Sequence, residues 1–295
     1  MSAPRTMPAR PPLRYHGGKW RLAPWVQRHF PAHRVYVEPF GGGAGVLLRK
    51  GISYAEVYND LDADVVAFFR VLRDRPDDLV RVATATPFAR AEWEAAYVPA
   101  QDDLERARRL LVRSHLGFGS AGSNVTHRTG FRGNVTRSRT TPAHDWARLP
   151  EHLVAVAERL RGVVVEHDAA ERVIARYDGM ETLHYCDPPY PHATRALLPE
   201  AVMGAVYAHE MDDDAHRGLA AALRGARGYV VLSGYPCALY DEELYPDWER
   251  VALDSWGSGQ GGAVRRTEVL WLNPACSAAL RRERVQLSLL EAAHA

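Results

Sequence analysis

Seven short apolar runs, several of them ending in an acidic or polar residue, recur along the chain and predict the strands of a sheet. A run of four to six mostly apolar residues bounded by turn residues is typical of a strand that is buried on both faces. Strands that alternate with helical patterns favour an α/β, doubly wound sheet of about seven strands. The predicted strands are residues 35–38, 55–58, 163–165, 182–186, 229–232, 248–253 and 267–272.

The middle of the chain departs from this alternation. Residues 75–160 carry helical and irregular patterns, with a helix expected at 104–116 and a loop rich in Gly, Ser, Thr and Asn at 117–141. We therefore expect one domain built from residues 1–74 and 161–295 together. A second, mainly helical domain, formed by residues 75–160, is inserted into it.

Three shorter elements are predicted near the ends of the chain. A helix is expected over residues 22–30, because Pro24 suits its first turn. A flexible, glycine-rich loop is expected at residues 257–262, between the last two strands. A charged helix then closes the chain.

Composition narrows the class of protein. The 295 residues are 46% hydrophobic and 25% charged, and no apolar run is long enough to span a membrane. The first dozen residues contain prolines and arginines but no apolar core of a secretory signal. We therefore expect a soluble, cytoplasmic protein without a membrane partner.

The cysteines and histidines do not suggest a metal site. Cys186, Cys237 and Cys276 are few and widely separated, which argues against a disulfide framework or a zinc ribbon. The histidines of the middle segment match no spacing of metal ligands. We expect no metal.

Basic residues are concentrated in two segments, although the net charge is only +1. Residues 1–34 contain seven Lys or Arg and no Asp or Glu, and residues 105–148 contain nine Arg against two acidic residues. Both segments suit a surface that faces a polyanion, although a solvated basic face has the same composition. Lys19 and Lys50 are the two lysines among the 37 basic residues, and all the others are Arg.

A glycine-rich loop follows the first predicted strand. Residues 39–46 make a turn that leads into a predicted helix through Arg49. Glycines let the backbone approach a ligand closely, and free amides at a helix start favour a carboxylate or a phosphate. Asp60 lies 19 residues after Gly41, at the end of the next strand, where an acid holds ribose in doubly wound folds. The loop and the acid together predict a nucleoside site.

The stretch Asp187-Pro188-Pro189-Tyr190 follows the fourth predicted strand. The chain leaves the sheet stiffly here, because proline fixes φ and lacks an amide hydrogen. A carboxylate, a rigid carbonyl and an aromatic ring together suit a flat group that carries an NH2, such as a nucleobase. The alternative interpretation is an ordinary turn at a strand end, which Asp-Pro commonly starts.

Together these stretches resemble the Dam-like D12 class of DNA adenine-N6 methyltransferases, and the resemblance covers nearly the whole chain. It implies a Rossmann-like methyltransferase sheet and S-adenosylmethionine as the cofactor. Residues 1–74 and 161–295 would form the catalytic domain, and residues 75–160 the DNA target-recognition domain. The matching segments are residues 14–19, 37–45, 59–60, 187–190, 232–235 and 266–271.

The resemblance also implies roles for single residues. Asp187, Pro188, Pro189 and Tyr190 form the catalytic pocket, in which Tyr190 stacks on the base. Relatives often carry Trp where this chain has Tyr15, but Tyr can still stack. Residues expected at the cofactor are Tyr15, Gly18, Lys19, Glu38, Phe40, Gly41, Gly42, Gly43, Gly45, Asp60, Asp168 and Asp187. Residues expected at double-stranded DNA are Arg14, Arg128, Arg132, Arg137 and Arg139.

The implied activity is direct methyl transfer from S-adenosylmethionine to the N6 amine of an adenine that is flipped out of the duplex, by a monomer. The Asp187 carboxylate and the Pro188 carbonyl would accept the amine hydrogens, which favours a more pyramidal nitrogen that can attack. One alternative is a methyltransferase for another planar amine or amide, such as cytosine N4 or glutamine. Those relatives usually carry Ser or Asn at the position of Asp187. The other alternative is a DNA-binding module without catalysis.

Overall fold

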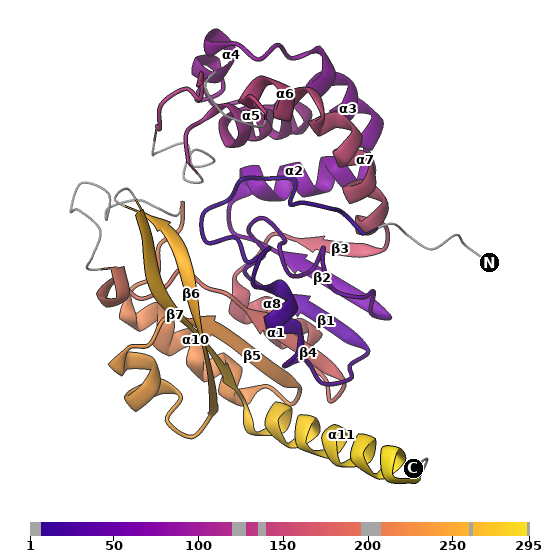
Figure 1. Ribbon diagram of the computed structural model, residues 1–295, viewed down its shortest axis with the longest axis vertical. Helices are drawn as coiled ribbons and strands as arrows, with labels where there is room; N and C mark the ends of the chain where they lie inside the picture. The colour runs from indigo at the N-terminus through magenta and orange to yellow at the C-terminus, as the bar shows by residue number, and fades with distance from the viewer. Residues whose placement is uncertain (1–6, 120–127, 135–139, 196–207, 260–261, 294–295) are drawn as a thin grey trace.

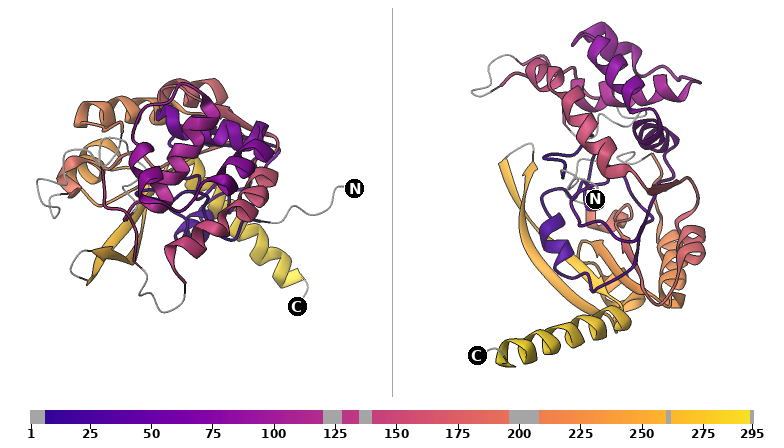
Figure 2. Two further views of the ribbon diagram at one scale, coloured as in Figure 1. Left: turned by 90° about the horizontal axis from the view of Figure 1, so that it is seen from above. Right: turned by 90° about the vertical axis from the view of Figure 1, so that its right-hand side faces the viewer.

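The computed structural model describes residues 7–119, 128–134, 140–195, 208–259 and 262–293. A twisted sheet with helices on its faces forms one part of the molecule, and a group of helices lies above one end of the sheet (Figure 1). The last helix, α11 (Pro274–Ala293), extends away from the body in both views of Figure 2. Within the described ranges, we find no helix that combines the length and the apolar character needed to span a membrane.

Seven strands form one mixed sheet in the order β3-β2-β1-β4-β5-β7-β6. The first five strands of this order pair in parallel, and β7 pairs antiparallel with both β5 and β6. The predicted seven-stranded, Rossmann-like α/β sheet is therefore confirmed. The strands are β1 (Val35–Glu38), β2 (Ala55–Asn59), β3 (Val163–Glu166), β4 (Thr182–Cys186), β5 (Tyr229–Gly234), β6 (Glu249–Gly259) and β7 (Gly262–Leu272).

The order of the strands reverses beside β1. From β1 the chain moves outward to β2 and β3, and it then returns to place β4 on the other side of β1. The carboxyl ends of β1 and β4 lie side by side, while their connections leave in opposite directions and open a crevice between them. All five residues of β4 are buried, as expected for a central parallel strand. The topology thus places Glu38 beside the residues that follow Cys186.

Alternation along the strands sorts their side chains onto two faces of the sheet. Tyr36 of β1 lies in a core shared with α2 (Ala63–Asp74) and α7 (Leu149–Leu160). Val37 belongs to the opposite face and packs against α8 (Ala170–Tyr177). Glu38 is two residues after Tyr36 on the same strand, so its side chain lies on the same face of the sheet, the face that is covered by α2 and α7.

The middle segment is mainly helical, as predicted. Its apolar side chains belong to the same core cluster as one face of the sheet, so the core is continuous between the two parts. Asp64 of α2 accepts from Arg113 at 2.7 Å and from Arg106 at 3.0 Å, which ties α5 to α2. The helices of this segment within the described residues are α3 (Pro76–Ala85), α4 (Arg90–Ala95), α5 (Asp103–Leu116), α6 (Pro142–Ala147) and α7.

Two predicted helices differ from the structure. The helix expected over residues 22–30 is limited to α1 (Ala23–Gln27), because the next three amides bond carbonyls three positions back and tighten the chain into turns. The helix expected after the glycine loop is only a series of turns over residues 44–50. Ala44 has a left-handed φ of 53°, and the Leu47 amide bonds the Glu38 side chain instead of a helical carbonyl.

The prediction of a flexible loop at residues 257–262 is also wrong. β6 and β7 remain paired up to Gly259 and Gly262, so the two strands continue through most of this glycine-rich stretch. Glycine has a low intrinsic tendency to form strands, but the antiparallel ladder supplies each backbone group with a partner.

Candidate active site

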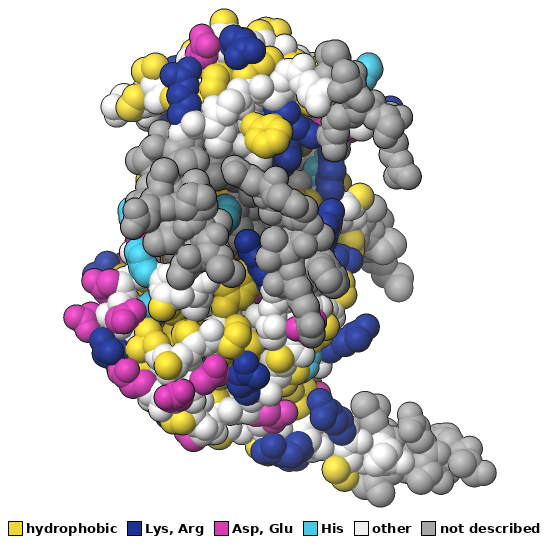
Figure 3. Space-filling view, turned by 60° about the vertical axis from the view of Figure 1, so that its left-hand side comes forward, with side chains coloured by type: hydrophobic (Ala, Val, Ile, Leu, Met, Phe, Trp, Pro, Cys, Tyr) yellow, Lys and Arg dark blue, Asp and Glu magenta, His cyan; other side chains and the backbone are white. Residues whose placement is uncertain are grey.

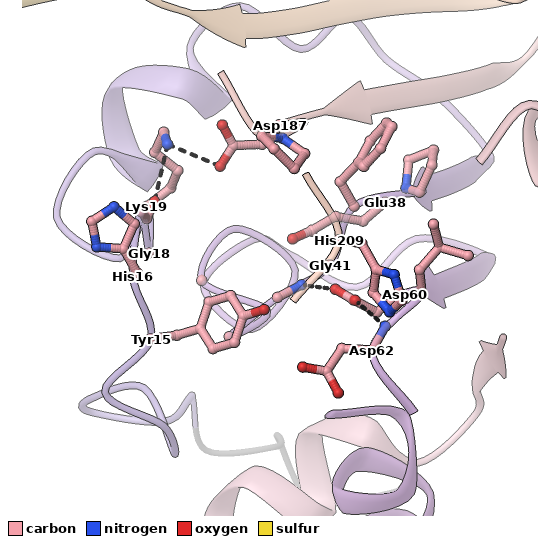
Figure 4. A pocket seen from close by; sticks show the side chains of 18 of the residues that line it. Tyr15, His16, Gly18, Lys19, Glu38, Gly41, Asp60, Asp62, Asp187 and His209 are labelled. Atoms are coloured by element: carbon pink, nitrogen blue, oxygen red, sulfur yellow. Dashed lines mark hydrogen bonds and ion pairs between the residues drawn. The ribbon is translucent and has the colours of Figure 1, made fainter. Parts of the chain in front are cut away.

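A pocket opens at the carboxyl edge of the sheet, at the ends of β1, β2 and β4 (Figure 4). It holds about 880 Å³ of empty space, including its open mouth, which is a suitable size for a nucleoside-like ligand. The structure thus brings together most of the residues assigned to the cofactor. Those that line the pocket are Tyr15, Gly18, Lys19, Glu38, Phe40, Gly41, Gly42, Gly43, Gly45, Asp60 and Asp187.

The glycine loop forms a pocket wall in which side chains have no room. A Cβ atom on Gly41 would lie 2.1 Å from the Tyr58 ring, and one on Gly45 would lie 2.9 Å from the backbone nitrogen of Trp20. Gly42 has a φ of +47°, which favours glycine. The Tyr58 hydroxyl donates to the Gly42 carbonyl at 2.8 Å and so fixes the loop to β2. The close backbone wall predicted from the glycines is present.

Two amides, one in this loop and one directly after it, bond carboxyl groups of the protein itself. The Gly42 amide donates to Asp60 Oδ2 at 2.7 Å, and the Leu47 amide donates to Glu38 Oε2 at 2.9 Å. The anion-binding helix start expected from the sequence is therefore not formed, because these two amides are already satisfied. The wall of the pocket is acidic, and it suits the cationic or hydroxyl groups of a ligand.

Asp60 stands at the end of β2, where a ribose acid was expected. Its Oδ1 accepts from the Asp62 amide at 2.8 Å, and Asp62 in turn caps the start of α2. Burial raises the pKa of Asp60 to about 6, although the two backbone amides favour its ionised form. Each oxygen keeps a lone pair that can accept a hydroxyl from the pocket.

Glu38 ends β1 and is 2% exposed at the edge of the pocket. The Tyr36 hydroxyl donates to its Oε2 at 2.7 Å. Burial raises the pKa of Glu38 to about 8, and the nearby charge of Asp187 acts in the same direction. At neutral pH the Glu38 carboxyl therefore keeps its proton in the free protein, and a cation placed against it favours loss of that proton.

Asp187 follows β4 directly and forms an ion pair with Lys19. Asp187 Oδ2 lies 2.9 Å from Lys19 Nζ, which also donates to the Gly17 carbonyl at 3.0 Å. The other carboxylate oxygen, Oδ1, is buried and has no hydrogen-bond partner among the described residues. A buried acceptor without a donor is unfavourable, so Oδ1 is available to a donor from a ligand. Pro189 lines the pocket and Pro188 does not.

Tyr190 lies beside the pocket and is not part of its lining. Its hydroxyl is 3.3 Å from Ser233 Oγ and donates to Glu268 Oε2 at 3.2 Å. Its ring meets Tyr235 edge to face, with the centroids 4.6 Å apart. Lys19 Nζ lies 4.8 Å from the centroid of the Tyr190 ring. The predicted stacking of Tyr190 on a base remains a prediction, since an ammonium group now lies over that ring.

Asp168 is the one assigned cofactor residue that does not line the pocket. Its carboxylate pairs with Arg172 at 2.5 Å and with Arg176 at 2.8 Å, and the hydrogen bond from Arg176 is the main cause of its lowered pKa. Ala170 reaches the pocket from this segment. The expected contact of Asp168 with adenine stays a prediction, which this arrangement does not support.

Two arginines assigned to DNA are described in the middle segment. Arg128 is exposed, and its guanidinium lies 4.9 Å from the Trp93 ring centroid and 5.3 Å from that of Tyr97. Arg132 is 12% exposed and lies 3.7 Å from Asp145. Arg128 is thus available to a partner, whereas Arg132 is held mostly inside the protein.

The other three arginines assigned to DNA are Arg14, Arg137 and Arg139. Arg14 donates through its backbone amide to Ser114 Oγ at 2.7 Å, which joins the amino-terminal segment to α5. Arg137 and Arg139 lie outside the described residues. Their expected contacts with DNA stay predictions.

Several pocket residues were not predicted. Asp62 and Tyr185 line the pocket, and both are close neighbours of residues that were assigned to it, so the alternation along the strands could have indicated them. His209 and Met211 also line it, but they come from a stretch that carries no recognisable pattern. Glu268, which holds Tyr190, lies 78 residues away from it, and no local signal connects the two.

The described part of the chain contains no group of three His, Cys, Asp or Glu side chains that could hold a metal ion. Its three cysteines are free thiols.

Comparison with known proteins gives consistent matches. Residues 15–220 match a family model described as D12 class N6 adenine-specific DNA methyltransferase. The chain is 27% identical to a DNA adenine methylase of Escherichia coli K12 over 188 residues, which cover 60% of this chain and 64% of that protein. It is 26% identical to a DNA adenine methylase of Vibrio cholerae over 192 residues, or 62% of this chain and 66% of the relative. The match thus spans less than two thirds of each relative.

The glycine wall yields a first prediction. Gly41→Ala should lower the free energy of unfolding by about 1 to 3 kcal/mol, because the new methyl group must displace the Tyr58 ring. Gly51→Ala is the matched control, since a Cβ at Gly51 meets nothing within 4 Å. Chemical denaturation of both variants measures the difference. Equal stability of the two variants would contradict the close packing of Gly41.

The buried acid of β1 yields a second prediction. The pKa of Glu38 rises from 4.5 to about 8 on folding, so its contribution to stability is full below pH 4.5 and is lost as the pH rises through 8. Gln keeps an acceptor for Tyr36 and does not ionise. In urea titrations, Glu38→Gln should match the parent near pH 5 and exceed its unfolding free energy by roughly 2 to 5 kcal/mol near pH 9. The same pH dependence in both proteins would show that Glu38 ionises freely.

Proposed function

The chain belongs to the D12 class of N6 adenine-specific DNA methyltransferases, and we propose that it methylates the N6 amine of adenine in double-stranded DNA, with S-adenosylmethionine as methyl donor. The observation that carries this proposal is the buried, unpartnered Oδ1 of Asp187, which borders a pocket walled by the glycine loop. An amine that enters beside Asp187 supplies the missing donor. The same pocket has room for a second, nucleoside-like molecule.

The pocket residues fit S-adenosylmethionine in size and in charge. The glycine loop leaves bare backbone on one side, and Glu38, Asp60 and Asp187 line the pocket with carboxyl groups (Figure 4). Three acids suit a ligand that carries an ammonium group, a sulfonium and ribose hydroxyls. When bound, this cofactor supplies a methyl group on a positively charged sulfur. In our proposal Asp60 accepts from the ribose, and the Tyr15 ring packs against the purine.

Asp187 and the backbone after it orient the target amine. Oδ1 accepts one hydrogen of N6 and the Pro188 carbonyl accepts the other, so the lone pair of the nitrogen turns toward the methyl group. Lys19 holds Oδ2 at 2.9 Å and thereby fixes the plane of the carboxylate. The task of these residues is alignment, because a correctly oriented pair of reactants crosses a much lower barrier.

Stacking of the target base on Tyr190 requires a rearrangement at Lys19. The ammonium lies 4.8 Å from the Tyr190 centroid, in the space that a stacked adenine ring would use. Glu268 and Ser233 hold the Tyr190 hydroxyl, so the ring itself is already fixed. In our proposal the Lys19 ammonium moves off the ring but keeps its ion pair with Asp187, and Tyr190 remains in place.

The helical segment of residues 75–160 is the part that we propose to face DNA. In Figure 3, several Lys and Arg side chains and little acidic surface are visible on the upper, helical part of the molecule, whereas Asp and Glu gather on the lower left among further basic side chains. A surface of positive charge attracts the phosphate backbone regardless of sequence. Arg128, exposed above Trp93, is the described arginine that best fits such a contact.

Asp187→Asn tests the catalytic part of this proposal. Asn keeps the shape of the side chain and an acceptor for Lys19, but it lacks the negative charge that draws the hydrogens of the amine. We expect single-turnover transfer of labelled methyl to duplex DNA to fall by roughly a hundredfold to a thousandfold. Calorimetric titration should show cofactor affinity within a few-fold of the parent. Asp187→Ala is less suitable, since it would leave the buried Lys19 charge unpaired.

The controls separate the alternatives. A duplex whose adenines all carry N6-methyl groups should take up no label, and label on cytosine instead would indicate an N4-methyltransferase. A parent protein that binds DNA but transfers no methyl group to any base would indicate a module without catalysis. Transfer by Asp187→Asn within threefold of the parent would remove Asp187 as the acceptor of the amine hydrogens.

Arg128→Ala tests the DNA-facing surface. It should weaken duplex binding several-fold and, for a phosphate contact, lower the slope of log affinity against log salt by about one. Arg281→Ala loses the same charge from an exposed site on α11, far from the helical segment (Figure 1), and should change neither quantity. Fluorescence anisotropy over a salt series measures both. Equal effects in the two variants would mean that only net charge matters.

A further inference from the structure

The second lysine of the chain, Lys50, lies in a buried ion cluster with Glu56 and Arg159. Lys50 Nζ is 2.6 Å from Glu56 Oε1, and Arg159 Nη1 is 2.6 Å from Glu56 Oε2. The exposed fractions of these three side chains are 4%, 4% and 0%. None of the three lines the active-site pocket. The buried ion cluster is therefore a separate feature of the core, which the proposed reaction does not use directly.

Three buried charges are seldom the most stable way to fill a core. The loss of hydration of buried ions commonly cancels their attraction, and apolar side chains of the same volume often stabilise a protein as well or better. Stability alone is thus a weak explanation for this cluster. Its contacts with neighbouring groups indicate what else it holds.

The buried ion cluster reaches Glu38 by two routes. Arg159 Nη2 donates to the Leu47 carbonyl at 2.6 Å, and the Leu47 amide donates to Glu38 Oε2 at 2.9 Å. On the other side, Lys50 Nζ lies 4.5 Å from the centroid of the Tyr36 ring, whose hydroxyl donates to the same Oε2 at 2.7 Å. Both donors that hold Glu38 are thus in contact with the cluster.

The two donors leave the carboxyl group of Glu38 in one orientation. Both reach Oε2, so Oε1 is the oxygen left for the pocket that Glu38 lines. The Tyr36 ring is fully buried between the Lys50 ammonium and the rest of the core, and its hydroxyl has little freedom to move. The proton that Glu38 keeps at neutral pH therefore lies on Oε1. A cation that displaces this proton binds an oxygen that is already held in place, so little side-chain entropy is lost on binding.

We propose that Tyr36 and the buried ion cluster are positioning residues, which hold Glu38 so that Oε1 receives the ammonium of the amino-acid part of S-adenosylmethionine. This inference rests on the proposed function of the pocket. Asp60, at the end of β2, remains for the ribose, and Asp187 remains for the target amine. Arg159 belongs to α7, so a helix of the proposed DNA-recognition segment helps to shape the cofactor site.

Tyr36→Phe tests this inference by calorimetric titration with two ligands. Phe keeps the ring over Lys50 and removes only the donor to Glu38. S-adenosylmethionine should bind roughly tenfold more weakly to the variant, as expected for the loss of one hydrogen bond to a charged group. Methylthioadenosine, which has the same nucleoside but no amino-acid group, should bind as it does to the parent. A general loosening of the pocket would weaken both ligands.

Two further variants complete the experiment. Tyr177→Phe removes a similar bond, from Tyr177 to Glu166 at 2.6 Å, outside the pocket lining, and should affect neither ligand. Arg159→Lys keeps a positive charge for Glu56 but lacks the second guanidinium nitrogen that donates to the Leu47 carbonyl. It should therefore also weaken binding of S-adenosylmethionine and leave that of methylthioadenosine unchanged. If Arg159→Lys does not fold, Tyr36→Phe still decides, since it removes a single hydroxyl.

The outcomes distinguish the two levels of inference. A parent that binds neither ligand would overturn the proposed cofactor, and with it the role of Glu38. A parent that binds S-adenosylmethionine, with Tyr36→Phe unchanged for it or equally weakened for both ligands, would overturn only the positioning role. The selective loss of S-adenosylmethionine affinity, with an unchanged thermal melting point, supports it.

Discussion

The parallel pairing of β1 with both β2 and β4 brings three carboxyl groups to one edge of the sheet. Glu38, Asp60 and Asp187 leave adjacent strand ends and share one pocket with a single lysine in its lining, Lys19. Burial with little hydration raises the pKa of Glu38 and of Asp60, and the charge of Asp187 adds to the rise at Glu38. A cation bound among these acids would favour their ionised forms. Lys19 already supplies such a cation to Asp187.

Much of the architecture could be predicted because its signals are local. Strands buried on both faces leave apolar runs that are hard to mistake, and a run of glycines after a strand indicates a close backbone approach, which is the arrangement found between Gly41 and Tyr58. The helix expected after the glycine loop failed for a different reason. Whether that segment forms a helix or turns depends on the bond between the Leu47 amide and the Glu38 side chain, and no local pattern contains such a contact.

In the candidate site, too, residues with a local sequence signal could be predicted, and contacts between distant residues could not. Asp60 and Asp187 were found because acids at the ends of parallel strands must meet at one edge of the sheet. Asp168 also follows a strand, but Arg172 and Arg176 of the next helix hold its carboxylate, so its position did not decide its role. The ammonium over Tyr190 comes from Lys19, 171 residues earlier in the chain, and only the folded structure shows that the two meet. Contacts of this kind are set by tertiary packing.

The placement of the lysines has a consequence for chemical modification. Both lysines of the chain are buried, with 7% and 4% of their side chains exposed, and every other basic side chain is a guanidinium. Reagents that acylate primary amines therefore meet no exposed lysine on the folded protein. Lys19 becomes reactive when the pocket rearranges, and Lys50 when the core opens. The rate of acylation at each lysine is thus a built-in probe of two separate motions, readable by mass spectrometry without an introduced label.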